Sequence, residues 1–240
     1  MDTHVAARLL ALNRGFYQTF SVDFARTRER LQPGAARIAG RIPRETRLLD
    51  LGCGSGQLAS YLLTERSPTL YMGLDLSLRL LDHARGQAVR QAEHARFVCA
   101  DLSARALPLR PAERFGWAFL FAVLHHLPGE ELRLRVCQEV HRLLVPGGHL
   151  ALSNWQFSRS DRLRRRIVPW EEVGLSAVEV DPGDALLDWR RGGRGLRYVH
   201  QIDEAERMRL CARAGFRETE HFASDGEGGN LSDYAVWEAV

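Results

Sequence analysis

The sequence predicts an α/β fold built on a doubly wound, mostly parallel sheet. Three observations support this prediction: apolar, strand-like segments alternate with helical ones, a glycine-rich turn joins the first strand to a helix, and three of the strands end at a polar group. Alternating strands and helices favour parallel pairing with right-handed crossovers. At 240 residues, the chain is long enough for one domain, or for one domain with an insertion.

The elements follow in order along the chain. Residues 6–16 and 31–42 carry apolar side chains at helical spacing, which predicts a helical cap before the first strand. The apolar runs that come next predict five strands, at 47–51, 70–75, 96–100, 116–124 and 149–155. Helical spacing, the capping residue Ser77 and the stop signal Pro146-Gly147-Gly148 predict the helices between them, at 57–64, from Ser77 onward, and at 130–144.

The regular pattern breaks between residues 156 and 200. This stretch is long for a connection and carries few periodic signals, and long loops at a ligand-binding edge tend to be functional. Asp203 and Glu206 then predict a capping box that opens a helix. Two further strands, at 217–223 and 234–239, predict an antiparallel hairpin at the edge of the sheet.

The glycine-rich turn has the spacing of a nucleoside-binding loop. Gly52, Gly54 and Gly56 follow the first strand, where missing Cβ atoms let a ligand approach the backbone and a helix N-terminus favours negative charge. A dinucleotide fingerprint needs its third glycine at the position of Gln57. The loop is therefore a poor fit to NAD.

Acidic residues at the ends of the next two strands support this interpretation. Asp75 comes 19 residues after Gly56, which is about the spacing at which a carboxylate binds ribose hydroxyls. Asp101 and Leu102 follow the third strand. Because the carboxyl ends of parallel strands meet at one edge of a sheet, we expect these groups and the glycine loop to surround one ligand.

Composition and length argue against several classes of protein. The chain has no run of 18 apolar residues and no signal peptide at its start, so we expect a cytoplasmic protein without a membrane span. The four cysteines lie far apart, which argues against a zinc site or a disulfide framework. The net charge of +3 does not by itself indicate nucleic acid. All 33 basic residues are arginine, a choice that coding bias or selection for bidentate anion contacts would explain.

As a set, these motifs resemble those of class I S-adenosylmethionine-dependent methyltransferases. The resemblance covers residues 45–155 and 203–240, and it implies a Rossmann-like seven-stranded sheet with an antiparallel last strand. It divides a single domain into a helical cap (1–44), a cofactor-binding core (45–155), a substrate-side insertion (156–200) and a C-terminal helix and hairpin (201–240). The cofactor implied is S-adenosylmethionine, with S-adenosylhomocysteine as its product and no metal.

The same resemblance implies which residues hold the cofactor. Gly52, Gly54 and Gly56 would line the methionine moiety, with Asp50 beneath the loop. Asp75 would bind the ribose hydroxyls. Asp101 and Leu102 would bind the adenine.

A narrower resemblance is to the tRNA wobble-uridine carboxymethyl methyltransferases. It rests on short matching segments: Phe16-Tyr17-Gln18, Phe24-Ala25-Arg26-Thr27-Arg28, Ala122-Val123-Leu124-His125-His126, Gln138-Glu139-Val140-His141-Arg142-Leu143-Leu144, Val168-Pro169-Trp170 and Arg197-Tyr198-Val199-His200. It implies a tRNA substrate, cofactor contacts from Tyr17 and Ala122, and an activating partner subunit as in some relatives. The chain departs from that family at Ser153-Asn154-Trp155-Gln156, where the family has Tyr-Val-Trp-Ala, and at Gly116, where it has an acid.

The acceptor chemistry leaves two sets of candidate residues. A carboxylate acceptor, as the narrower family implies, is already an anion and needs only a cation to orient it, for which Arg28 and Arg197 are the candidates. An amine or hydroxyl acceptor would need a base, for which His125, His126 and His200 are the candidates. The alternatives to a tRNA methyltransferase are a small-molecule carboxylate or hydroxyl methyltransferase and a non-catalytic, cofactor-binding partner protein.

Overall fold

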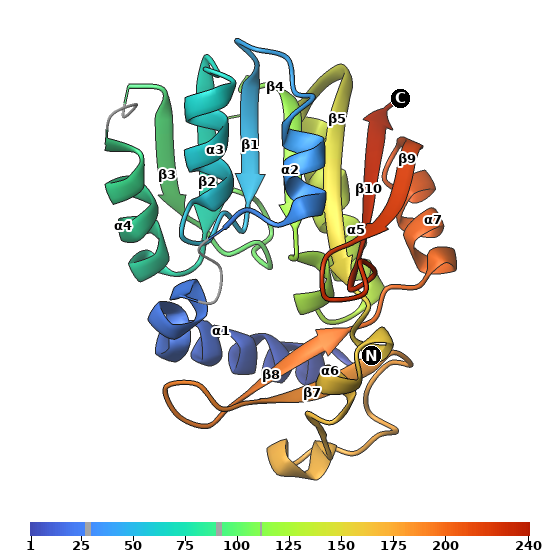
Figure 1. Ribbon diagram of the computed structural model, residues 1–240. Coiled ribbons are helices and arrows are strands. Elements are labelled where there is room, and N and C mark those ends of the chain that lie inside the picture. Colours follow the sequence, from blue (N-terminus) through green and yellow to red (C-terminus); the bar gives the residue numbers. More distant parts are fainter. Residues whose placement is uncertain (27–29, 90–92, 111) are drawn as a thin grey trace.

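The centre of the computed structural model is a seven-stranded sheet with the strand order β3-β2-β1-β4-β5-β10-β9 (Figure 1). The structure describes residues 1–26, 30–89, 93–110 and 112–240. Strand β10 pairs antiparallel with both β5 and β9, and the remaining pairs are parallel. The strands are β1 (Arg47–Leu51), β2 (Leu70–Asp75), β3 (Ala95–Cys99), β4 (Phe115–Phe121), β5 (Leu144–Trp155), β9 (Phe216–Ser224) and β10 (Ser232–Ala239). This arrangement confirms the α/β fold with an antiparallel last strand.

Helices cover both faces of this sheet (Figure 1). The helices α2 (Pro33–Ala39), α3 (Gln57–Glu65) and α4 (Leu78–Gln87) lie on one face, and α5 (Glu130–Leu143) and α7 (Glu204–Arg213) lie on the other. In β1, Leu48 packs with α2 and α3, whereas the next residue, Leu49, packs with the layer that holds α5 and α7. Since both faces are covered, the central strands are continuous apolar runs, which is why their bounds were predictable.

Several boundaries differ from those that the sequence predicted. The first helix, α1 (Thr3–Arg26), is longer than expected, and β5 begins at Leu144 and includes the turn that was expected to precede it. Strand β4 ends at Phe121 because Ala122 adopts a φ of +57°, and a 3-10 turn, η2 (Leu124–His126), follows. The Ser77 hydroxyl accepts a hydrogen bond from Leu80 N, which confirms the predicted cap of α4.

The insertion forms a second sheet, which the sequence did not predict. Its three antiparallel strands are β6 (Ile167–Val168), β7 (Asp184–Trp189) and β8 (Gly195–His200), preceded by the short helix α6 (Asp161–Arg164). Val199 packs against Phe157 and Leu163 on one side, whereas Tyr198 packs against α1 on the other. Because both faces of the sheet are buried, its strands lack the alternation of polar and apolar residues that marks a half-exposed strand.

Helix α1 and the three-stranded sheet lie together below the carboxyl ends of the parallel strands (Figure 1). The N-terminal helix and the insertion are far apart in the sequence, but both lie at the edge where the parallel strands end, which is where open α/β sheets bind ligands. Within the described ranges, no helix combines the length and the apolar character that crossing a bilayer requires.

A buried chain of polar side chains joins the two sheets. Arg133 on α5 donates from Nε to Glu206 on α7 at 2.7 Å, and the other oxygen of Glu206 lies 2.7 Å from Nε2 of His200 on β8. His200 Nδ1 lies 2.6 Å from a carboxylate oxygen of Asp184 on β7. All four side chains are nearly or fully inaccessible to solvent.

The buried polar side chains show that one half of the predicted capping box is right and the other half is wrong. Asp203 does cap α7, accepting a hydrogen bond from Glu206 N at 2.7 Å. The Glu206 side chain, however, turns inward to Arg133 and His200 rather than back to the start of the helix. Burial alone would lower the pKa of His200, but its bonds to Asp184 and Glu206 outweigh that effect and raise the pKa above 6.5.

Replacing Glu206 with glutamine is expected to destabilise the fold by about 3–5 kcal/mol, because it leaves Arg133 charged and buried without its partner. With its raised pKa, protonated His200 contributes stability in full below pH 6.5, and that contribution is lost as the pH rises through the folded-state pKa. The Glu206→Gln variant should lose less stability than the unaltered protein over this pH interval. Urea unfolding between about pH 5 and about pH 9 measures both effects.

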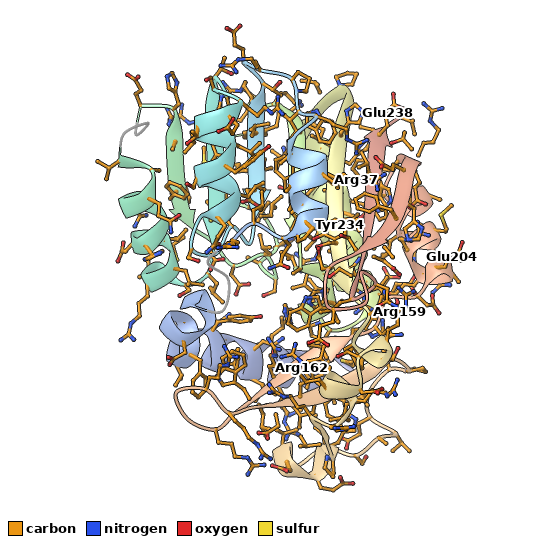
Figure 2. The ribbon with its side chains drawn as sticks, in the orientation of Figure 1. Arg37, Arg159, Arg162, Glu204, Tyr234 and Glu238 are labelled. Carbon is orange, nitrogen blue, oxygen red and sulfur yellow. The ribbon has the colours of Figure 1, made fainter. Side chains whose placement is uncertain are left out.

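The matched control is Glu204→Gln, which changes an exposed glutamate on the same helix that points away from the sheet (Figure 2). It should change the free energy of unfolding by less than about 0.5 kcal/mol. Equal destabilisation by the two substitutions would contradict the role assigned to the buried chain.

Candidate active site

A cavity of about 580 Å³ lies at the carboxyl ends of β1, β2 and β4, between the large sheet and the layer of α1 and β8. Its volume falls within the range of small-molecule and cofactor sites. The structure brings ten of the predicted site residues to its wall: Tyr17, Asp50, Gly52, Gly54, Asp75, Asp101, Leu102, Ala122, His126 and Arg197.

Three other predicted site residues, Gly56, His125 and His200, do not line the cavity. Gly56 has a φ of +87°, and a Cβ there would lie 2.8 Å from the Cβ of Ala84, so this glycine permits close packing of α3 on α4. His125 is fully buried and stacks on Trp155, with 5.0 Å between ring centroids. His200 belongs to the buried chain between the sheets, and Arg28 lies outside the described residues.

The glycine loop and Asp75 are held together by hydrogen bonds. Gly54 N donates to Asp75 Oδ2 at 2.9 Å, and Ser77 N donates to Asp75 Oδ1 at 2.8 Å. These bonds orient the carboxylate at the end of β2. Burial raises the pKa of Asp75, and the backbone donors only partly offset this effect. Gly54 has a φ of +56°, and a Cβ built on it would meet no other atom within 4 Å, so the backbone here is open to the cavity.

Asp50 lies beneath the glycine loop, in the apolar layer of β1. Burial raises its pKa to about 7, against the opposing effect of the hydrogen bond that it accepts from the hydroxyl of Tyr71. A cation placed beside it would favour the ionised form. Asp50 is therefore suited to receive a positively charged group of a ligand in this end of the cavity.

Asp101 is held from two sides. Its Oδ1 accepts from Ser103 N at 2.8 Å and from Ser103 Oγ at 2.6 Å, and its Oδ2 pairs with Arg14 of α1 at 2.5 Å. Arg14 therefore reaches from α1 over the end of the cavity that contains the strand-end acids. Sequence reasoning missed Arg14, because an arginine on an amphipathic helix normally faces solvent.

Arg197 lines the cavity from β8 of the insertion, among aromatic rings. Its guanidinium carbon lies 4.6 Å from the ring centroid of Trp155, 5.5 Å from that of Phe16 and 5.6 Å from that of Trp189. The residue is only 5% exposed. Rings packed on a guanidinium restrict its orientation and contribute a cation–π attraction.

Asn13 connects three of the elements around the cavity and was also missed. Its side-chain amide donates to the carbonyl oxygens of His126 and Tyr198, both at 3.1 Å, and its Oδ1 accepts from Tyr198 N at 2.8 Å. Tyr17, one turn further along α1, bonds through its hydroxyl to His126 Nε2 at 2.8 Å. The only sequence signal for Asn13 is a polar residue on the apolar face of a helix.

Charge is unevenly distributed around the cavity. The acids lie near the glycine loop and the strand ends, and most of the arginines come from α1 and the insertion. The acids that line it are Asp50, Asp75, Asp101 and Asp225, and the arginines are Arg14, Arg30, Arg162, Arg166, Arg191 and Arg197. Such an arrangement suits a cationic, hydroxyl-bearing ligand at the glycine loop and an anionic ligand beside Arg197.

Comparison with known proteins agrees with this geometry. Residues 49–152 match the family model of a methyltransferase domain. Over 195 residues, the chain is 30% identical to a tRNA (carboxymethyluridine(34)-5-O)-methyltransferase of Arabidopsis thaliana, in a match that covers 79% of this chain and 44% of that protein. It is 30% identical over 172 residues to the 27-O-demethylrifamycin SV methyltransferase of Amycolatopsis mediterranei, covering 70% of this chain and 60% of that protein. The chain thus spans about half the length of these relatives.

A solved structure shares the fold. The S-adenosylmethionine-dependent methyltransferase of Methanosarcina mazei superimposes with a TM-score of 0.67 at 21% identity, over 88% of this chain and 99% of that one. The strand order, the glycine loop between β1 and α3, and the matched domain all agree with this likeness. The chain thus carries a methyltransferase domain at residues 49–152, in a fold that it shares with S-adenosylmethionine-dependent methyltransferases.

Proposed function

We propose that the protein transfers a methyl group from S-adenosylmethionine to a carboxylate oxygen on tRNA, namely that of a carboxymethyl group on a wobble uridine. The observation that carries this proposal is the position of Arg197, which shares one cavity with the glycine loop and Asp75. The Arabidopsis relative, whose name specifies carboxymethyluridine at position 34, supports the choice of acceptor. An activating subunit and a cytoplasmic location stay predictions.

The residues at the acidic end of the cavity fit the cofactor. The open backbone at Gly54 leaves room for the methionine moiety, and Asp50 would accept hydrogen bonds from the ammonium group of that moiety. Asp75 would accept hydrogen bonds from the ribose hydroxyls, and Asp101 with Leu102 would bind the adenine. When bound, S-adenosylmethionine would supply a methyl group that is carried on a positively charged sulfonium.

The acceptor end requires orientation rather than acid–base chemistry. A carboxylate is ionised at neutral pH, so it would accept the methyl group from the sulfonium without a base: an O–C bond would form as the C–S bond breaks, and a neutral thioether would remain. No proton is transferred. Arg197 would hold the carboxylate through its paired N–H groups, and the surrounding rings would keep the guanidinium aligned.

A small-molecule acceptor is the second candidate. The cavity, at about 580 Å³, is large enough for a small ligand, and the Amycolatopsis relative is named for a small-molecule substrate. For a hydroxyl acceptor, His126 is the candidate base, because it lines the cavity and its Nε2 bonds to Tyr17.

The decisive experiment is a methyl-transfer assay with labelled S-adenosylmethionine and a synthetic anticodon stem–loop that carries carboxymethyluridine at the wobble position. The proposal expects the label in a base-labile methyl ester on that nucleoside, identified by mass spectrometry. A stem–loop with an unmodified uridine is the matched control. Calorimetry that detects cofactor binding, together with no transfer to the modified stem–loop, would overturn the assigned acceptor and leave the small-molecule alternative.

Replacing Asp75 with asparagine is expected to weaken S-adenosylmethionine binding by ~1–3 kcal/mol, because an amide is a poorer acceptor for the ribose hydroxyls than a carboxylate. Isothermal titration calorimetry measures this change. Asp82→Asn, which alters an exposed carboxylate on α4, should leave the affinity unchanged. An unaltered affinity in the Asp75 variant would contradict the ribose assignment.

Replacing Arg197 with glutamine is expected to lower kcat/KM for the acceptor by about tenfold to a hundredfold, since the carboxylate loses a charge-assisted, bidentate partner. Cofactor affinity should not change, because the aromatic rings around Arg197 belong to elements other than the glycine loop and the acidic strand ends. Steady-state kinetics with a varied acceptor concentration, paired with cofactor calorimetry, separate the two effects. Arg190→Gln, at a position that is highly exposed, serves as the control. A parallel loss of cofactor binding would argue against the role assigned to Arg197.

A further inference from the structure

Three arginines of the insertion extend the basic end of the cavity outward. Arg162 lies on α6, Arg166 directly precedes β6, and Arg191 lies in the turn between β7 and β8. Figure 2 labels Arg162 in the part of the molecule that lies below the large sheet. All three line the cavity, and within the described ranges no carboxylate forms an ion pair with any of them. We call these three residues the arginine rim.

Neighbouring arginines of the same insertion are neutralised by acids. Arg164 pairs with Asp161, and Arg194 pairs with Glu172 at 2.6 Å. Neither of these arginines lines the cavity. Arg159 and Arg190 of the insertion also pair with carboxylates and do not line the cavity, whereas Arg165 neither lines it nor has an ion pair among the described residues. The rim arginines thus combine a place in the cavity wall with the lack of a carboxylate partner within the described ranges.

The rim is attached to rigid structure. The backbone carbonyl of Arg166 accepts a hydrogen bond from Asp188 N on β7 at 2.8 Å, and Leu163, between Arg162 and Arg166, is buried in the core of the insertion. These contacts anchor the backbone at two of the three rim positions, Arg162 and Arg166. Cations in a fixed arrangement can hold several anionic groups in a defined register.

One acceptor carboxylate needs one guanidinium, which Arg197 supplies inside the cavity. Three further cations around the cavity, on two separate segments, exceed the charge of such a group. A nucleic-acid backbone carries one charge per nucleotide, and the fork of an arginine matches a phosphate. We propose that Arg162, Arg166 and Arg191 contact RNA phosphates that flank the acceptor nucleotide, an inference that rests on the proposed function.

Two triple variants with the same change in net charge test this surface. The rim variant is R162Q/R166Q/R191Q, and the control variant is R164Q/R194Q/R213Q, in which Arg213 pairs with Glu130 and Glu131 on the far face of the large sheet. Fluorescence anisotropy with an unmodified anticodon stem–loop, repeated over a range of salt, gives the affinity and the salt dependence. Cofactor calorimetry on both variants confirms that the fold and the glycine loop are intact.

We expect the rim variant to bind the stem–loop at least about tenfold more weakly, and the slope of log K against log salt to fall by about two, as for the loss of three phosphate contacts. The control variant should lose less than about threefold. Equal losses in the two variants would mean that only net charge matters, and would overturn the proposal. An equal loss of affinity for poly-glutamate would overturn it too, because the surface would then be a general anion site.

The outcomes also distinguish this surface from the proposed acceptor. Rim-dependent binding without methyl transfer to carboxymethyluridine would overturn that acceptor and support the RNA surface. Methyl transfer to a small-molecule carboxylate, with no binding of the stem–loop by the unaltered protein, would overturn the surface and leave the carboxylate chemistry in place.

Discussion

Strand β8 determines the geometry of the proposed acceptor end, because it carries Arg197 and because the residues that follow Arg197 on the strand are held by buried hydrogen bonds. Asn13 of α1 bonds to both the N–H and the C=O of Tyr198, and His200 at the end of the strand is held between Asp184 and Glu206. These bonds are buried, so breaking any one of them leaves a polar group without water. The guanidinium of Arg197 is therefore positioned by contacts to helices that are distant in the sequence.

The charges around the cavity have two different structural origins. The acids near the glycine loop are produced by short-range structure, since each follows a strand of a parallel sheet. The arginines at the other end depend on how the insertion docks. Burial raises the pKa of both Asp50 and Asp75, so the acidic end holds its charge most readily when a cationic or hydrogen-bonding ligand is present.

The core of the fold was predictable because its signals are local. The bounds of β1 and β2, the glycine loop and the Ser77 cap each depend on a few adjacent residues, and the structure has them where the sequence predicted them. The proposed cofactor end of the cavity follows from those elements, since parallel strands bring their carboxyl ends together.

The acceptor end was less predictable because its contacts are long-range. His200 looks like a candidate base in the sequence, and only the docking of β8 on α7 shows that its two nitrogens are bonded to carboxylates. Asn13 bonds to a residue 185 positions away, which no local pattern reveals. The sheet of the insertion is buried on both faces, so its strands lack the periodicity that would have identified them.

Helix α1 has a further consequence for how the two ends of the cavity communicate. Arg14 contacts Asp101 at the acidic end, whereas Asn13 and Tyr17, on the same helix, contact β8 and His126 at the basic end. Because one rigid element covers both ends, a displacement of α1 that opens one of them alters the contacts at the other. Linkage then requires that any effect of one ligand in this cavity on the affinity of a second is reciprocal.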